Sequence, residues 1–212
     1  MARAWVSFMR FLAISSVLCC MCDSNPFTPD TGVPITTGGP ESQRATPVGV
    51  IDQLLTAYEN QSSKLFVELF PADKSFRFYV SPRLIESGTD VNIVPEEIDT
   101  SLKYVPQGTY RYWTHDSEVR SHERLFSEAA YIRVEAPPVF DEEDFCYHLN
   151  DSGDTVGVEV LMLGGELLIG LSAGAYTEEQ HPVVIERQVF YLERGADNLW
   201  VIKKWFDFGT TG

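Results

Sequence analysis

Basic residues are scarce in this sequence. It holds 16 Lys and Arg against 31 Asp and Glu, which gives a net charge of −15. Binding to a nucleic-acid backbone or to an anionic lipid surface requires clustered positive charge, and a strongly acidic chain repels both. We therefore expect no nucleic-acid function.

Cysteine is scarce as well. Three of the four cysteines lie within residues 19–22, and Cys146 is the only one beyond them. Neither a structural disulfide nor a Cys-rich or His-rich metal site is expected from this distribution. We interpret Cys146 as a small buried apolar residue. The sequence thus predicts no metal, no cofactor and no catalytic motif.

Long hydrophobic runs are missing too. A membrane-spanning helix needs about 20 apolar residues. The stretch FLAISSVL is shorter, and VEVLMLGGELLIGL is interrupted by Gly164, Gly165 and Glu166. The first 22 residues instead combine Arg3 and Arg10, the short apolar stretch and the cysteine cluster. This pattern is typical of an export signal.

The cysteine cluster resembles the lipidation site of a bacterial lipoprotein signal, and we prefer Cys20 as the lipidated residue. An ordinary secretory signal cut nearby is the alternative. We predict an export signal in residues 1–19, a disordered Pro-, Gly-, Ser- and Thr-rich tether in residues 20–45, and one domain in residues 46–212. The expected location is the bacterial cell envelope, attached to the membrane by the lipid, or secreted or periplasmic in the alternative.

Helical patterns come early in the domain. Thr46 and Pro47 have the residue types of a helix start, and apolar residues follow at helical spacing from Val50 to Tyr58. A second short helix is predicted around residues 65–70, and a third over residues 113–126. Residues 94–105 are expected to form another short helix. In residues 75–82 an alternating strand places Phe76, Phe78 and Val80 on one side.

Strand patterns dominate the later part of the chain. Four are predicted, at residues 130–136, 155–163, 183–193 and 199–208, with a loop at residues 170–182. Helices early and strands late, without βαβ alternation, indicate an α+β fold with a mainly antiparallel sheet.

This order of elements resembles the NTF2-like superfamily (cystatin-like cone, SnoaL-like). Residues 46–80 are similar to its opening helices and Phe-rich strand, and DNLWVIKKWFDF to its closing strand. WTHDSEVRSHERLF resembles a helix of uncharacterised bacterial lipoproteins with this fold. The resemblance implies N-terminal helices packed on a curved sheet. A β-bulge near Lys203 and Lys204 would return Trp205 to the inner face, and a two-sided strand is the alternative.

Aromatic side chains are the main candidates for a binding site. A cone closed by helices can enclose an apolar hollow that binds a small molecule, and a filled core is the alternative. The candidate ligand-binding residues are Phe78, Tyr112, Trp113, Tyr191 and Trp205.

Enzymes of the superfamily that the chain resembles use an acid or a His–Asp pair inside the cone. The nearest candidates are His115 with Asp116, Asp207, and Glu186 with Arg187, and none matches an enzyme motif. Asp116 or Thr114 is expected to cap the third predicted helix, and Asp116 is interpreted as a cap rather than a catalytic acid. His115 and His122 form a poor metal pair, and the acidic residues 141–154 a solvated loop rather than a calcium site.

The function expected from these observations is that of a lipid-tethered envelope protein whose domain binds a small apolar ligand or a protein partner without catalysis. An isomerase or dehydratase of the NTF2-like kind is the alternative. A deep pocket with two buried titratable groups in hydrogen-bond contact would favour the enzyme. A homodimer formed through the outer face of the sheet is a third possibility.

Overall fold

The structure is a computed structural model, which describes residues 43–80, 94–98, 101–172 and 178–209. The predicted export signal, Cys20 and most of the predicted tether lie outside the described residues. Within the described ranges, no helix combines the length and the apolar character needed to cross a membrane.

Three helices form one layer: α3 (Pro47–Glu59), α4 (Ser63–Val67) and α6 (His115–Glu128). The first begins as predicted, because the Thr46 hydroxyl accepts a hydrogen bond from the Gly49 N–H at 3.1 Å and Pro47 needs no such partner. The Ser62 hydroxyl caps α4 in the same way. All three helices predicted at these places are confirmed.

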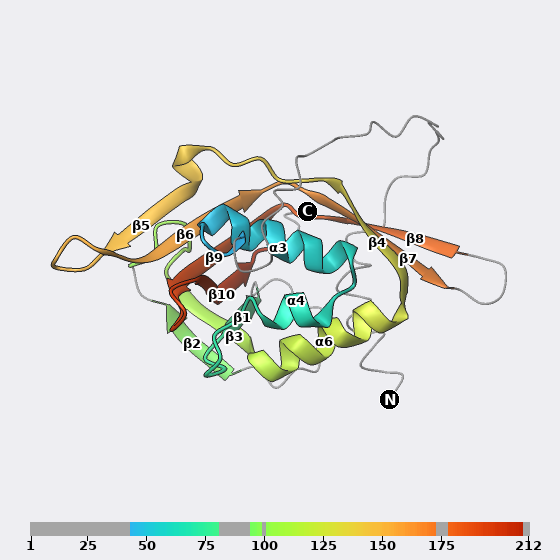
Figure 1. Cartoon of the computed structure of the whole chain (residues 1–212), viewed down its shortest axis with the longest axis horizontal. Coiled ribbons are helices and arrows are strands. Elements are labelled where there is room, and N and C mark those ends of the chain that lie inside the picture. Colours follow the sequence, from blue (N-terminus) through green and yellow to red (C-terminus); the bar gives the residue numbers. More distant parts are fainter. Residues whose placement is uncertain (1–42, 81–93, 99–100, 173–177, 210–212) are drawn as a thin grey trace.

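The other layer consists of strands (Figure 1). The larger sheet has the order β2-β3-β1-β10-β9-β6-β5, and a smaller one has the order β4-β7-β8. Neighbouring strands are antiparallel except for β1 and β10, which are parallel. The strands are β1 (Arg77–Val80), β2 (Val94–Ile98), β3 (Gly108–Thr114), β4 (Ala129–Ala136), β5 (Phe145–Leu149), β6 (Thr155–Leu163), β7 (Glu166–Ser172), β8 (Glu178–Val184), β9 (Arg187–Arg194) and β10 (Trp200–Asp207).

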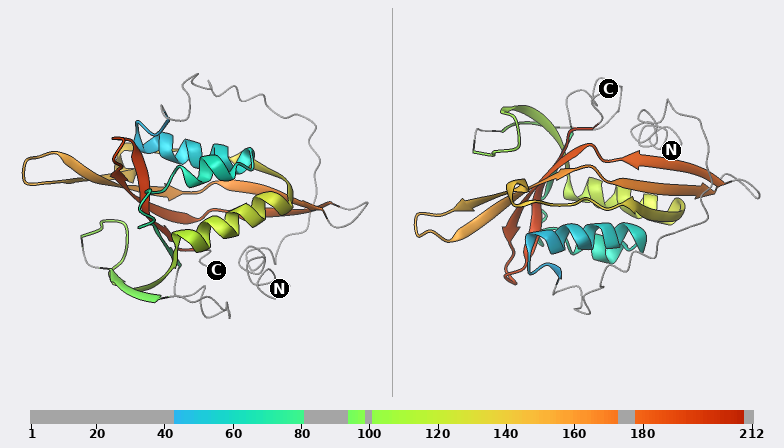
Figure 2. Two further views of the ribbon diagram at one scale, coloured as in Figure 1. Left: turned by 60° about the horizontal axis from the view of Figure 1, so that its bottom comes forward. Right: turned by 90° about the horizontal axis from the view of Figure 1, so that it is seen from above.

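A bend at Gly164 and Gly165 joins the two sheets. Both residues have positive φ, 76° and 116°, which glycine adopts without the steric cost that a Cβ would add. Across the bend, Gly164 N–H donates to the Glu186 carbonyl at 3.3 Å and Ile185 N–H to the Gly165 carbonyl at 2.8 Å. The smaller sheet therefore continues the larger one at an angle (Figure 2). This confirms the predicted α+β class with helices on a curved, mainly antiparallel sheet.

The larger sheet is buried on both faces. Its inner face packs against the helices, and Phe78 and Val80 belong to this inner core. On the outer face, Tyr79 and Phe206 belong to a second core that Ile98, Leu102 and other side chains of the 98–105 region help to cover. The alternation predicted for β1 is thus correct, but the outer core was not anticipated.

The bulge in β10 is confirmed. The pairing of β10 with β9 shifts in register between Ile202 and Lys204. As a result Trp200, Ile202 and Trp205 all lie in the inner core, although strict alternation would place Trp205 on the other face.

Three local predictions are wrong. The helix predicted at residues 94–105 is instead the edge strand β2, where a proline is tolerated because one side of the strand needs no backbone donor. The loop predicted at residues 170–182 includes the end of β7 and most of β8. The acidic residues 141–154 hold a short 3₁₀-helix and β5 rather than a loop alone. In each case pairing with a neighbouring strand outweighs local composition.

Candidate functional site

A cavity of about 150 Å³ lies between the helices and the bend of the sheets. An apolar cavity of this size can hold a molecule with one ring. Most of its lining is apolar or aromatic, and a few lining side chains are titratable. The lining includes Leu54, Leu55, Tyr58, Phe78, Trp113, Glu118, His122, Leu125, Met162, Leu167, Ile169, Val183, Ile185, Glu186, Gln188, Trp205 and Asp207.

His122 lies on α6 and is 5% exposed. Its Nδ1 is 3.1 Å from the backbone carbonyl of Glu118, and its Nε2 is 2.5 Å from the hydroxyl of Tyr58. A carbonyl can only accept, so Nδ1 carries the proton, and in the neutral ring Nε2 accepts from the Tyr58 hydroxyl. Burial lowers the pKa of His122 to about 4, so the ring is neutral at physiological pH.

Glu118 precedes His122 by one helical turn and is 1% exposed. Burial raises the pKa of its carboxyl to about 8, and the negative charge of Asp207 adds to this effect. The carboxyl is therefore largely protonated at neutral pH. Its Oε1 lies 3.3 Å from Nδ1 of His122, whereas the buried Oε2 has no hydrogen-bond partner among the described residues. With its proton on Oε2, Glu118 is a neutral acid whose O–H group has no acceptor among the described residues.

Asp207 brings a second carboxyl to the cavity from the end of β10. One of its oxygens, Oδ1, accepts a hydrogen bond from the Gly209 N–H at 2.9 Å. Burial raises the pKa of Asp207, and the hydrogen bond from Gly209 partly opposes this effect. On the same strand, the indole N–H of Trp205 is buried with no hydrogen-bond partner in the described part of the chain. The cavity thus offers polar groups that a ligand could satisfy.

These groups form a chain from Tyr58 through His122 to Glu118, with Asp207 nearby. Burial, Glu118 and Asp207 together raise the pKa of Tyr58 well above its usual range, so it remains a hydroxyl. The site combines a neutral acid, a carboxyl with raised pKa and an apolar wall. Such a set can donate and accept protons near neutral pH.

Three of the five predicted aromatic residues line the cavity. Phe78 stacks on Trp113 at a ring-centroid distance of 5.3 Å and meets Trp205 edge-on at 5.2 Å. Tyr112 and Tyr191 lie elsewhere: Tyr112 packs against Tyr79 of the outer core, and Tyr191 against His148. Their placement follows from strand alternation, since their neighbours Trp113 and Phe190 face inward.

Of the other candidate residues, His115 and Asp116 lie outside the cavity lining. His115 lies at the start of α6 against Phe70 and is not part of the cavity lining. Asp116 is not the cap of α6, because Thr114 occupies that position and Asp116 instead binds Lys74 and His115, each at 3.0 Å.

Glu186 and Arg187, at the start of β9, point to different places. Glu186 lines the cavity. Arg187 donates to the Tyr104 carbonyl at 2.5 Å and lies over the Phe208 ring, in the outer core region. The two side chains therefore lie on opposite sides of the sheet and do not form one site.

Sequence reasoning missed Glu118 and the role of Tyr58. A signal was present, since Glu118, His122, Leu125 and Phe126 follow helical spacing and therefore share one face of α6. A glutamate and a histidine on the buried face of a helix indicate a polar group inside the core, which needs partners.

Solved structures with a similar backbone include NTF2-like proteins. An NTF2-like superfamily protein from Salmonella enterica subsp. enterica serovar Typhimurium str. LT2 matches 81% of this chain and 94% of its own, with 11% identity and a TM-score of 0.48. A conserved protein from Planctomyces limnophilus DSM 3776 matches 74% of this chain and 88% of its own, with 8% identity and a TM-score of 0.46.

A ketosteroid isomerase-like protein from Erwinia carotovora atroseptica SCRI1043 matches 77% of this chain and 93% of its own, with 12% identity and a TM-score of 0.38. No protein-family model and no curated protein matches the sequence. These likenesses concern the course of the backbone and not the activity.

Proposed function

We propose that this chain is an acid–base enzyme of the isomerase or dehydratase kind, whose substrate is a small, largely apolar molecule with a carbonyl group. The observation that carries the proposal is the buried carboxyl of Glu118, which is protonated at neutral pH and has one oxygen without a hydrogen-bond partner among the described residues. A binding pocket for an apolar ligand alone needs no such group, because an unsatisfied buried carboxyl costs free energy.

In the proposed reaction Glu118 is the acid and Asp207 the base. Asp207 removes a proton from the carbon next to the substrate carbonyl, while Glu118 donates a hydrogen bond or its proton to the carbonyl oxygen. Isomerisation ends when the proton is returned to a different carbon. Dehydration ends when a hydroxyl on the next carbon along takes the proton that Asp207 removed and leaves as water, while a C=C bond forms and the carbonyl is restored. A pKa of about 8 suits Glu118 as the acid, because proton transfer is fastest when the pKa lies near the working pH, and the raised pKa of Asp207 makes it a stronger base than an ordinary aspartate.

His122 and Tyr58 position the acid. The Nδ1–H of His122 donates to the backbone carbonyl of Glu118, and the same ring lies 3.3 Å from Oε1, which holds the carboxyl in place and leaves Oε2 as the oxygen that carries the proton. Tyr58 fixes the His122 ring by donating to Nε2. The aromatic walls formed by Phe78, Trp113 and Trp205 exclude water and favour an apolar substrate.

The non-catalytic interpretation rested on the lack of paired titratable groups. His122 and Tyr58 are hydrogen-bonded at 2.5 Å at the cavity, and Glu118 is within 3.3 Å of the same ring. This arrangement meets the condition that favours the enzyme. Ligand binding without turnover becomes the competing result of the experiment below.

Isomerisation and dehydration share one step, the removal of a proton from the carbon next to the carbonyl. This step can be tested with cyclohexanone, a ketone with one ring. In D₂O, the protein should accelerate deuterium exchange at the carbons next to the carbonyl, followed by NMR. Glu118→Gln and Asp207→Asn should each lower the rate by roughly 10²- to 10⁴-fold, the usual contribution of a general acid or base. Asp116→Asn, a carboxyl on the exposed face of α6, is the matched control and should leave the rate unchanged.

Binding is measured in parallel from the fluorescence of Trp113 and Trp205, which line the cavity. Cyclohexanone that changes the fluorescence but exchanges no faster than in buffer would overturn the catalytic proposal in favour of a binding protein. Exchange that persists in both Glu118→Gln and Asp207→Asn would overturn the assignment of these residues as acid and base.

We also propose, from residues 1–22 alone, that the chain is exported and carries a lipid on Cys20. Labelling of cells with a radioactive fatty acid should mark the wild-type protein and not the Cys20→Ser variant, with Cys22→Ser as the control. Label that survives in Cys20→Ser would place the lipid elsewhere, and an unlabelled wild-type protein would favour ordinary secretion.

A further inference from the structure

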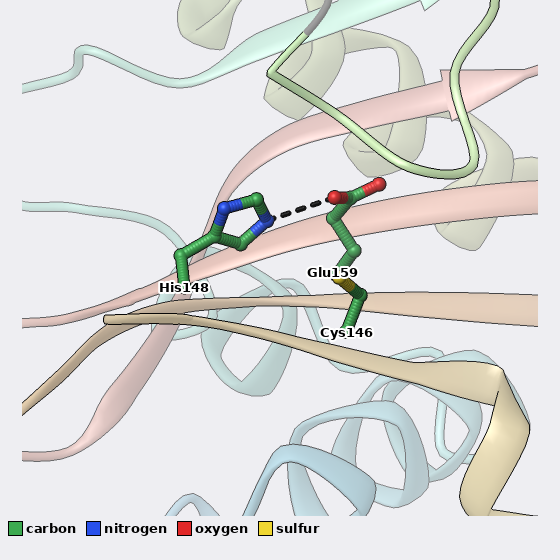
Figure 3. Close-up of side chains that lie close together, drawn as sticks. All are labelled: Cys146, His148 and Glu159. Carbon is green, nitrogen blue, oxygen red and sulfur yellow. Dashed lines mark hydrogen bonds and ion pairs between the residues drawn. The ribbon is translucent and has the colours of Figure 1, made fainter. Parts of the chain in front are cut away.

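A second polar cluster lies on the hairpin of β5 and β6, away from the cavity. Cys146, His148 and Glu159 come together there (Figure 3). The sulfur, a ring nitrogen and a carboxylate oxygen all lie within 4.8 Å of one another. Neither the acid–base site nor the packing of the hairpin accounts for the three together.

The strand pairing places these side chains on one face. Cys146 stands directly opposite Glu159 in the register of β5 and β6. His148 follows Cys146 by two positions, so its side chain points to the same side of the strand. The neighbours of Glu159, Val158 and Val160, belong to the inner core, so the cluster lies on the outer face of the sheet.

Glu159 is fixed in place. Its side chain is fully buried, and its two oxygens accept the backbone N–H groups of Lys103 and Tyr104 at 2.8 and 2.9 Å. Oε1 also lies 2.8 Å from Nε2 of His148. These bonds explain the buried carboxylate, which anchors the segment after β2. They do not explain why a thiol and an imidazole face it.

The cluster is accessible from solvent on one side. Cys146 and His148 are half-buried. His148 also lines a polar surface hollow together with Glu96, Glu97 and Glu193. Negative charge along this hollow attracts cations toward the cluster.

We propose that Cys146, His148 and Glu159 form a binding site for a divalent transition-metal ion of the Zn²⁺ class, with water as the fourth ligand. Sulfur, nitrogen and carboxylate oxygen are the donors that Zn²⁺ uses, and three protein ligands with an open position are typical of non-structural zinc sites. A thiolate and a carboxylate balance the two positive charges.

The distances allow this with small side-chain movements. In a tetrahedral site, bonds of about 2.3 Å to sulfur and about 2.1 Å to nitrogen or oxygen place the donors about 3.4–3.6 Å apart. The separations of up to 4.8 Å therefore shorten by about 1.2–1.4 Å at most. The Nε2–Oε1 hydrogen bond of 2.8 Å opens slightly as both atoms bind the ion.

A cysteine nucleophile activated by His148 fits the geometry less well. Nε2 of His148 is engaged by Glu159, and no hydrogen bond joins Cys146 to His148 in the structure as described. Burial also raises the pKa of the Cys146 thiol, and Glu159 raises it further, which disfavours a free thiolate.

The test uses Co²⁺ as a spectroscopic substitute for Zn²⁺, added to the full chain with Cys19, Cys20 and Cys22 replaced by serine. Cys146 is then the only thiol. Binding should produce thiolate-to-cobalt charge-transfer absorption and the visible bands of tetrahedral Co²⁺, and Zn²⁺ should displace it at one ion per chain. Equilibrium dialysis gives the affinity for Zn²⁺ directly.

Variants assign the ligands. Cys146→Ser should abolish the charge-transfer band, and His148→Ala should weaken Zn²⁺ binding by at least the roughly 10- to 100-fold that loss of an outer-shell partner costs. His115→Ala, a histidine at the start of α6 that packs against Phe70, is the control and should bind normally.

Circular dichroism of each metal-free variant shows whether it is folded. Absence of Co²⁺ absorption in the folded parent protein would overturn the proposal. So would Zn²⁺ binding that is equal in the parent, Cys146→Ser and His148→Ala.

Discussion

Replacing Glu118 by glutamine should change how the stability of the protein depends on pH. The folded protein holds the Glu118 proton up to a pKa of about 8, whereas the unfolded chain releases it near the ordinary value of 4.5. A group that binds its proton more tightly when folded stabilises the fold at low pH, and this stabilisation is lost as pH rises through the interval. Glutamine does not titrate, so the variant lacks this loss.

The magnitude follows from the two pKa values. Each pKa unit corresponds to about 1.4 kcal/mol, so the wild-type protein should lose about 4 kcal/mol relative to Glu118→Gln between pH 5 and pH 8.5. Glutamine has nearly the same size as glutamate and leaves the bond from Nδ1 of His122 to the backbone carbonyl of residue 118 in place, so the His122 contribution is similar in both proteins. As pH rises, the difference in the free energy of unfolding between the two proteins should therefore shift steadily in favour of Glu118→Gln.

The comparison with the variant matters because His122 acts in the opposite direction. Its pKa falls from 6.5 to about 4 on folding, so it adds stability as pH rises through that interval. In the wild-type protein, the stability gained from His122 offsets the stability lost from Glu118 up to about pH 6.5. Above that pH, only the loss of stability from Glu118 remains. The wild-type curve alone would hide most of the effect.

Urea unfolding followed by tryptophan fluorescence at several pH values measures the free energy of unfolding of both proteins. Asp116→Asn is the control, because the pKa of that exposed carboxyl is lowered by His115 and Lys74 and its small effect has the opposite sign. A stability difference between Glu118→Gln and the wild type that stays constant with pH would refute the assignment of Glu118 as a buried neutral acid.

Four further substitutions test the helix caps, the site and the smaller sheet by urea unfolding. Thr46→Ala should cost about 1 kcal/mol because it removes the cap bond of α3, whereas Thr114→Ala should cost less because that cap residue makes no such bond, and equal losses would contradict this account. Tyr58→Phe should cost about 1–3 kcal/mol by leaving a buried imidazole nitrogen without its donor, and no loss would mean that water replaces the hydroxyl. Gly170→Ala should cost about 1–3 kcal/mol because the new Cβ would lie 2.3 Å from the Tyr131 ring unless that ring moves, and an unchanged midpoint would show that it moves freely.

The sequence predicted the parts of the fold that local patterns determine. Thr46 and Pro47 marked the start of α3, and the aromatic pattern of β10 indicated a bulge that the register shift between Ile202 and Lys204 confirms. Strand β2 was mistaken for a helix because its residues show little alternation, and only its pairing with β3 makes it a strand. Patterns within a segment carry no information about distant partners.

The site was less predictable for the same reason. Phe78 was expected on the inner face from strand alternation and Trp205 from the bulge, whereas Trp113 was named only as one of several aromatic residues close together in the sequence. The partnership of Tyr58 with His122 joins two helices, and that of Cys146 with Glu159 joins two strands. Such contacts depend on the packing angle and the register, which neither helix nor strand periodicity specifies.

The central place of β10 links the site to the completion of folding. β10 lies between β1 and β9, so the β2-β3-β1 group and the β9-β6-β5 group share no backbone hydrogen bonds except through it. This same strand supplies Trp205 and Asp207 to the cavity. A nascent chain therefore has no competent cavity until its last described strand has inserted, and any activity of the site appears only after both halves of the sheet are joined.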